Sequence, residues 1–182
     1  MFNLVNELKN YKSFDKDEES DRLKTLEFLS QQTNCFSRSN LLGHVNAGGL
    51  VVDGYGNILL NHHKILDMWF QFGGHSDGNE NSLEVAKREI EEESGIKDID
   101  LLTNGIFDVC VNLIDSNEKK HEPEHYHYDI NFLFKTSSKN FVVSSESKEL
   151  KWVSIDEALK LINSEDKSMR RMIEKYKNML NL

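Results

Sequence analysis

The chain has 182 residues and a formal net charge of −9, and 29 % of its residues are charged against 38 % hydrophobic. This length suits one domain with a substantial core, and the negative charge argues against a nucleic-acid polymer as partner. No run of about eighteen apolar residues is present, so we expect no membrane contact. The N-terminus is acidic and lacks a continuous apolar segment, so no signal peptide is visible, and Cys35 and Cys110 lie far apart without a CxxC motif, which does not suggest a disulfide framework. We therefore expect a cytoplasmic protein.

Residues 1 to about 32 are predicted to be helical. Apolar residues recur there at helical spacing in two groups, Leu4, Val5 and Leu8 and then Leu23, Leu26 and Leu29. Asp15 with Glu18 supplies a cap between them. We assign residues 1–40 to an N-terminal helical extension that packs without chemistry of its own, and contact with a second subunit in a homodimer is the alternative.

A change to β-structure is predicted from about residue 41. The segment GHVNAGGLVVD is rich in small and β-branched residues, residues 54–57 form a turn, and Ile58 begins a return strand. Strand signals recur at 101–111, 127–135 and 149–153, and helices are expected at 154–161 and 168–180. This order predicts an α/β domain over residues 41–182, with a mixed sheet packed between helices.

One more helix is predicted inside the stretch GHSDGNENSLEVAKREIEEESGI, residues 74–96. Asn81 with Glu84 forms a capping box at its start, and Gly95 suits the left-handed position at its end. Three apolar residues mark the buried face: Leu83, Ala86 and Ile90.

Three carboxylates of this helix, Glu89, Glu92 and Glu93, lie on the flank beside the apolar stripe. Charges of one sign at this spacing repel one another, and a bound cation explains their placement. Oxygen ligands favour a hard ion, Mg²⁺ first and Mn²⁺ second. A solvated acidic face is the alternative, but Gly73 and Gly74 precede the helix and let the backbone approach a metal or phosphate.

The same stretch matches, without departure, the Nudix hydrolase signature G-x5-E-x7-R-E-U-x-E-E-x-G-U, where U is aliphatic. Its fixed positions are Gly74, Glu80, Arg88, Glu89, Glu92, Glu93 and Gly95. The chain therefore resembles that family, and the resemblance implies the Nudix α/β/α sandwich from about residue 41. The segments GHVNAGG and HHKILDMWFQFGGHSDGN are similar to those of a bacterial subgroup with a GGH-type loop.

The resemblance also implies roles for individual residues. Glu89, Glu92 and Glu93 would bind the metal together with the backbone carbonyl of Gly73. Gly74, Glu80 and Gly95 would shape the loop and helix, and Arg88 would pair with Glu80 to hold the loop on the helix.

The chemistry implied is attack of water on a phosphorus of a diphosphate, aided by magnesium. Glu92 is the first candidate for the base that accepts the proton of the water. Glu146 is the second, because related enzymes often supply an acidic residue from a loop placed as residues 144–147 are, before Trp152. Glu149 is a weaker candidate, and an exposed loop glutamate is the alternative for Glu146.

Histidines form a second group of candidates. His125, His127 and Asp129 alternate along a predicted strand and share one face; His127 and Asp129 are candidates for substrate contact or for a further metal. No cysteine or second histidine pair completes a zinc set, and a solvated sheet face is the alternative. His75 lies in the glycine loop and is a further substrate-binding candidate, whereas His44 and the pair His62–His63 have weaker claims.

Three functions follow from these residues. The first is a Mg²⁺-dependent hydrolase of a nucleoside diphosphate linked to another moiety, with Trp69, Phe70 or Tyr128 as candidates for stacking on a base. The second is a non-catalytic domain that binds and senses a nucleotide, although such domains commonly lose box glutamates. The third, isopentenyl diphosphate isomerase, requires a cysteine near the glycine loop, where this chain has none.

Overall fold

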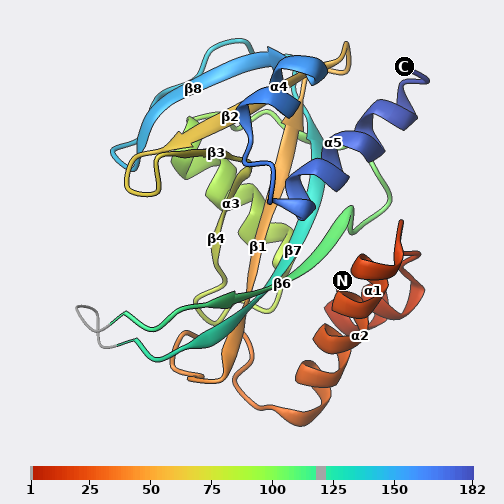
Figure 1. Ribbon diagram of the computed structural model, residues 1–182, viewed down its shortest axis with the longest axis vertical. Helices are drawn as coiled ribbons and strands as arrows, with labels where there is room; N and C mark the ends of the chain where they lie inside the picture. The colour runs from red at the N-terminus through yellow and green to blue at the C-terminus, as the bar shows by residue number, and fades with distance from the viewer. Residues whose placement is uncertain (1, 118–121) are drawn as a thin grey trace.

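A computed structural model describes residues 2–117 and 122–182 (Figure 1). The strands are β1 (Gly43–Val52), β2 (Asn57–His63), β3 (Met68–Phe70), β4 (Phe72–His75), β5 (Asp100–Leu101), β6 (Asp108–Ile114), β7 (His125–Lys135) and β8 (Ser147–Ser154). The helices are α1 (Leu4–Asn10), α2 (Lys16–Gln31), α3 (Ser82–Ser94), α4 (Ile155–Leu161) and α5 (Lys167–Met179). The chain forms a mixed, curled sheet with helices on both faces.

The sheet is organised around the parallel pair β1 and β7, which run side by side from Gly43 opposite Tyr126 to Val52 opposite Lys135. All other strand pairs are antiparallel: β2 and β4 pair with the other edge of β1, β5 and β6 with β7, and β3 and β8 with β2. β4 and β2 pair with the same edge of β1, so the loop that follows β4 leaves the sheet near its centre (Figure 1).

Alternation along β1 and β7 sends side chains into two separate cores. Val45, Ala47 and Val51 face a first core that includes the apolar side of α3 and the N-terminal helices. Leu50 and Val52 face a second core formed with α4 and α5. The polar residues at the other end of this second face, described below, line a cavity.

The acidic helix α3 forms as its sequence predicts. The Asn81 side chain accepts a hydrogen bond from the backbone N–H of Glu84 at 3.3 Å, and Gly95 ends the helix with a φ of 70°. Ala86 and Ile90 are fully buried. The apolar side is therefore anchored in the core, which places Glu93 of the flanking side against β2 and β4.

The N-terminal helices contribute to the same core as the sheet. Leu4 and Leu8 of α1 are buried, and Phe28 of α2 stacks on Tyr128 of β7 with ring centroids 4.1 Å apart. The prediction that Leu23 lies on the inner side of α2 is wrong, because its side chain is 51 % exposed while Glu18 is fully buried.

The burial of Glu18 is explained by an ionic network that joins α2, α5 and β6. Lys175 Nζ lies 2.6 Å from Glu18 and 3.0 Å from Asp108, and it donates to the Phe107 carbonyl at 2.8 Å. Arg171 contacts Asp108 through two hydrogen bonds of 2.7 and 2.9 Å. Two cations and two carboxylates balance in charge, which makes their joint burial tolerable.

Among residues 2–117 and 122–182, no helix has the length and apolar character needed to cross a bilayer.

Candidate active site

Glu93 is the best-anchored carboxylate of α3. Its two oxygens accept hydrogen bonds from Asn61 Nδ2 at 2.9 Å and from the backbone N–H of Gly73 at 3.0 Å. Burial raises the pKa of this carboxyl to about 7, with a further contribution from the negative charge of Glu89. Glu93 therefore binds the start of β4 and the middle of β2 to the helix.

Glu89 lies one helical turn earlier, against Gly74 of β4. A Cβ on Gly74 would overlap its carboxylate, so a larger residue at this position would displace the Glu89 carboxylate from the backbone. Burial raises the pKa of Glu89 to about 6, although the neighbouring Arg88 guanidinium opposes the shift. Two half-buried carboxyls with raised pKa values beside the backbone of β4 form a suitable environment for a divalent cation.

Arg88 connects the loop to the helix, but through other partners than expected. One guanidinium nitrogen donates to the His75 carbonyl at 2.8 Å and to the Glu89 carboxylate at 2.7 Å. Glu80, the partner implied by the resemblance, is exposed, and the described part of the chain contains no ion pair between it and Arg88. Residues before β1 hold the loop that follows β4 instead. Arg38 pairs with Asp77 at 2.8 Å, and the backbone N–H of Gly78 donates to the Phe36 carbonyl.

The two candidate bases differ in their surroundings. Glu92 is exposed and makes no hydrogen bond or ion pair within the described ranges, so its carboxylate is free to contact solvent. Glu146 lies in the loop before β8, and its negative charge contributes to the raised pKa values of both Glu89 and Glu93. Glu146 is among the main contributors to both pKa values and Glu149 is not, so the electrostatics favour Glu146.

A cavity of about 300 Å³ extends from Glu93 and Gly73 across the sheet. Its far wall includes His75, His127 and Asp129, so the three substrate-binding candidates share one cavity with a metal-ligand candidate. Asp129 accepts hydrogen bonds from Asn46 at 3.0 Å and from Asn112 at 2.7 Å, and burial raises its pKa.

The three aromatic residues predicted to stack on a base lie in different parts of the structure. Phe70 lines this cavity. Trp69 stacks on His62, with ring centroids 4.7 Å apart. Tyr128 is buried in the first core against Phe28, so the suggestion that Tyr128 stacks on a base is wrong: it lies on the opposite face of β7.

The structure brings more histidines together than the sequence analysis expects. The rings of His44 and His75 have centroids 5.1 Å apart, and that of His127 lies 4.7 Å from His44. Burial lowers the pKa of His44 to about 3 and that of His127 to about 4, and it also lowers the pKa of His75. These imidazoles are therefore neutral near pH 7.

No role is predicted from the sequence for Asn61, Asn46 and Asn112, and only a weak claim to substrate binding is predicted for His44. Asn61 interrupts the apolar run Ile58–Leu60, and Asn46 lies among small apolar residues. A polar side chain inside an apolar strand was the available signal, since buried amides are retained where they have hydrogen-bond partners.

Comparison with known proteins identifies the family. The NUDIX domain model matches residues 42–176. The chain belongs to the NUDIX family. No match is found among curated proteins.

Several solved Nudix structures share the fold. A MutT protein from Methanosarcina mazei Go1 superposes with a TM-score of 0.61 at 19 % identity, covering 79 % of this chain and 99 % of that chain. A C. elegans Ap4A hydrolase in a binary complex gives 0.60 at 18 % identity, with 75 % and 97 % coverage. The NUDIX domain of Shewanella oneidensis NrtR complexed with ADP ribose gives 0.55 at 14 % identity, with 85 % and 97 % coverage. The family match and these neighbours support a Nudix-type pyrophosphohydrolase.

Proposed function

We propose that this chain is a Mg²⁺-dependent hydrolase that cleaves the pyrophosphate bond of a nucleoside diphosphate linked to another moiety. The observation that carries the proposal is the pair Glu89 and Glu93, two half-buried carboxyls with raised pKa values, packed against Gly73 and Gly74 of β4. Two half-buried acids that share a single cation, the Arg88 guanidinium beside Glu89, carry an excess negative charge that a bound metal ion would offset.

The donor set fits a hard divalent ion. Glu89, Glu92 and Glu93 would bind it with the Gly73 carbonyl, and Mn²⁺ would replace Mg²⁺ because both take oxygen ligands. When bound, the ion would neutralise the diphosphate oxygens and lower the pKa of the attacking water.

The other residues would orient these groups and the substrate. Arg88 holds the His75 carbonyl and Glu89 together, which fixes the loop relative to the helix. Glu92, exposed beside the buried pair, would accept the proton of the water, and Glu146 is the second candidate for that step. His75, His127 and Asp129 line the same cavity and would contact the part of the substrate beyond the diphosphate.

The substrate class is supported by the neighbours. One is an Ap4A hydrolase, one is an E. coli dihydroneopterin triphosphate pyrophosphohydrolase, and one is a domain complexed with ADP ribose. Phe70, in the wall of the cavity, is our candidate for contact with a base. We also infer a cytoplasmic location, which the two free, buried cysteines suit.

The domain assignment follows the same lines. We propose residues 41–182 as the Nudix domain and residues 1–40 as an N-terminal extension, because the family model begins at residue 42.

The test is phosphate or nucleotide release from a panel of diphosphate compounds with Mg²⁺. We expect wild type to cleave one class, and Glu92→Gln to lower kcat by about 10²–10⁴-fold, the usual contribution of a general base. Glu91→Gln is the matched control, since Glu91 points to solvent and pairs with Lys97. If nothing is cleaved and one nucleotide raises the melting temperatures of wild type and Glu92→Gln equally, the chain is a nucleotide-binding sensor.

A further inference from the structure

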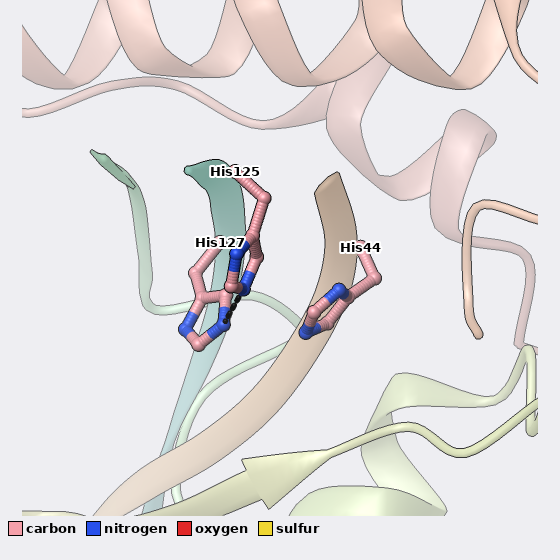
Figure 2. Close-up of side chains that lie close together, drawn as sticks. All are labelled: His44, His125 and His127. Carbon is pink, nitrogen blue, oxygen red and sulfur yellow. Dashed lines mark hydrogen bonds between the residues drawn. The ribbon is translucent and has the colours of Figure 1, made fainter. Parts of the chain in front are cut away.

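Three histidines meet beyond the acidic helix. His44 of β1 is directly opposite His127 of β7 in the parallel pair, and His125 precedes His127 by two residues, so all three project from the same face. Figure 2 shows the three rings turned toward a common space between the two strands. One ring nitrogen from each lies within 4.8 Å of the others. Within residues 2–117 and 122–182, this is the one group of three such side chains that converges so closely.

His44 indicates that this space is built for a ligand. Its side chain is only 3 % exposed, and neither ring nitrogen has a hydrogen-bond partner among the described residues. A neutral imidazole carries one N–H and one lone pair, and burying both without partners is costly. A bound electrophile at the centre of the cluster would use the lone pair.

His125 is already oriented as a metal ligand would be. Its Nδ1 lies 2.8 Å from the Pro123 carbonyl, which can only accept, so Nδ1 carries the proton. The lone pair of His125 is therefore on Nε2, which accepts a hydrogen bond from Nε2–H of His127 at 3.1 Å; a metal ion bound to both nitrogens would replace this bond and its proton. An N–H donated to a backbone carbonyl is the common device that fixes the tautomer and ring plane of a metal-binding histidine.

We propose that His44, His125 and His127 bind a divalent transition metal ion, with Zn²⁺ the preferred one, at a site separate from the glutamates of α3. Imidazole nitrogen suits zinc, whereas Mg²⁺ takes oxygen ligands and belongs with the carboxylates. In a tetrahedral zinc site, with Zn–N bonds of about 2.0–2.1 Å, ligand nitrogens are about 3.3 Å apart. The His125–His127 separation of 3.1 Å is close to that distance, and a ring nitrogen of His44 lies within 4.8 Å of both.

The surroundings suit a cation. The cluster opens on a cavity of about 400 Å³, and among residues 2–117 and 122–182 the charged side chains in its wall are Arg38, Asp115 and Glu122. Arg38 is paired with Asp77, so the two carboxylates are available to offset the charge of an ion. His75, whose ring centroid lies 5.1 Å from that of His44 and 5.4 Å from that of His127, borders the open side.

A metal ion bound at this position would have two effects. It would cross-link β1 to the start of β7 and so fix the base of the β6–β7 hairpin, which extends away from the body of the sheet (Figure 1). It would also place a positive charge next to His75 and His127, which line the cavity that contains Glu93. The inference does not depend on hydrolysis, because metal binding is measured directly.

The test is a calorimetric titration of metal-free protein with Zn²⁺ in excess Mg²⁺, which keeps the carboxylates occupied. We expect wild type to bind one equivalent of Zn²⁺ and His127→Asn to bind it on the order of 100-fold more weakly. His62→Asn is the matched control, since His62 contacts Asp67 and Trp69 outside the cluster. Glu93→Gln, on the acidic helix, is expected to retain the zinc affinity of wild type.

X-ray absorption of zinc-loaded wild type requires no substitution and so avoids any folding defect of the variants. We expect at least three imidazole nitrogens at about 2.0–2.1 Å from zinc. An all-oxygen shell, the absence of zinc binding by wild type, or equal affinity in wild type and His127→Asn would each overturn the proposal. Loss of zinc in Glu93→Gln alone would instead assign the ion to the glutamates.

Discussion

Glu93 is the residue on which the account of the acidic helix depends most. It contacts β2 through Asn61 and β4 through Gly73, and burial keeps its pKa at about 7. The same carboxylate therefore holds α3 against the sheet and is also a candidate metal ligand. Substitution by glutamine mimics the protonated form and removes the negative charge that a cation requires.

For Glu93→Gln we expect Mn²⁺ affinity, measured by calorimetry at pH 8, to fall on the order of 100-fold. Without metal at the same pH, the variant should melt at a higher temperature than wild type, because it no longer buries a charged carboxylate. Glu91→Gln, two residues earlier and exposed, should change neither value. Unchanged Mn²⁺ affinity in Glu93→Gln would remove this residue from the metal site.

At the scale of elements, the ionic network attaches the N-terminal helices to the rest of the chain. Glu18 of α2 and Lys175 of α5 lie 2.6 Å apart in the interior, with Asp108 of β6 beside them. The positive charge of Lys175 lowers the pKa of Glu18, and burial raises that of Asp108. The buried sides of α1 and α2 are thus used within this chain, whereas a homodimer stays a prediction.

Lys175→Met should destabilise the protein by about 3–5 kcal/mol, because it leaves two buried carboxylates facing one cation. Urea unfolding followed by circular dichroism measures this difference. Lys177→Met is the matched control on the same helix: Lys177 is partly exposed and lies 4.0 Å from Asp156, so its loss should cost about 0–1 kcal/mol. Equal stability of the two variants would show that the network contributes little.

The difference between what the sequence predicts and what the structure contains follows from the range of the interactions. The capped helix α3 depends on residues within one or two turns of each other, so Asn81 and Gly95 predict its bounds correctly. Glu18 is buried because its partners, the backbone N–H of Val109 and the Lys175 ammonium, come from far along the chain. His44 joins His127 only through the parallel register of β1 and β7, and no local pattern specifies that register.

At the scale of the whole molecule, two groups of residues give opposite dependences of stability on pH. Glu89 and Glu93 have pKa values raised to about 6 and about 7, so their contribution to stability is present at low pH and is lost as pH rises through these values. His44 and His127 have pKa values lowered to about 3 and about 4, so their contribution is present above about 6.5 and is lost as pH falls.

The two contributions offset each other between about pH 4.5 and 6.5, so in chelator we expect the melting temperature to fall steeply on the acid side and only slightly above about pH 6.5. Saturating Mg²⁺ should remove the slight decline above about pH 6.5 and leave the acid side unchanged, since the cation compensates the carboxylates and not the histidines. Thermal melts from about pH 4 to 8.5 in chelator and in Mg²⁺ measure both limbs. A melting temperature that rises steadily to pH 8 in chelator would contradict the proposed burial of the two carboxyls.

The most direct test of the proposed hydrolysis is cleavage of the best substrate with Mg²⁺ in ¹⁸O-labelled water, followed by ³¹P NMR. Attack of water on phosphorus places one labelled oxygen on a single phosphate product and shifts its resonance, and we expect this label with wild type and Glu91→Gln and at a greatly reduced rate with Glu92→Gln. Label found instead in the non-phosphate product would place the attack on carbon. Turnover by Glu92→Gln at the wild-type rate would show that Glu92 is not the base.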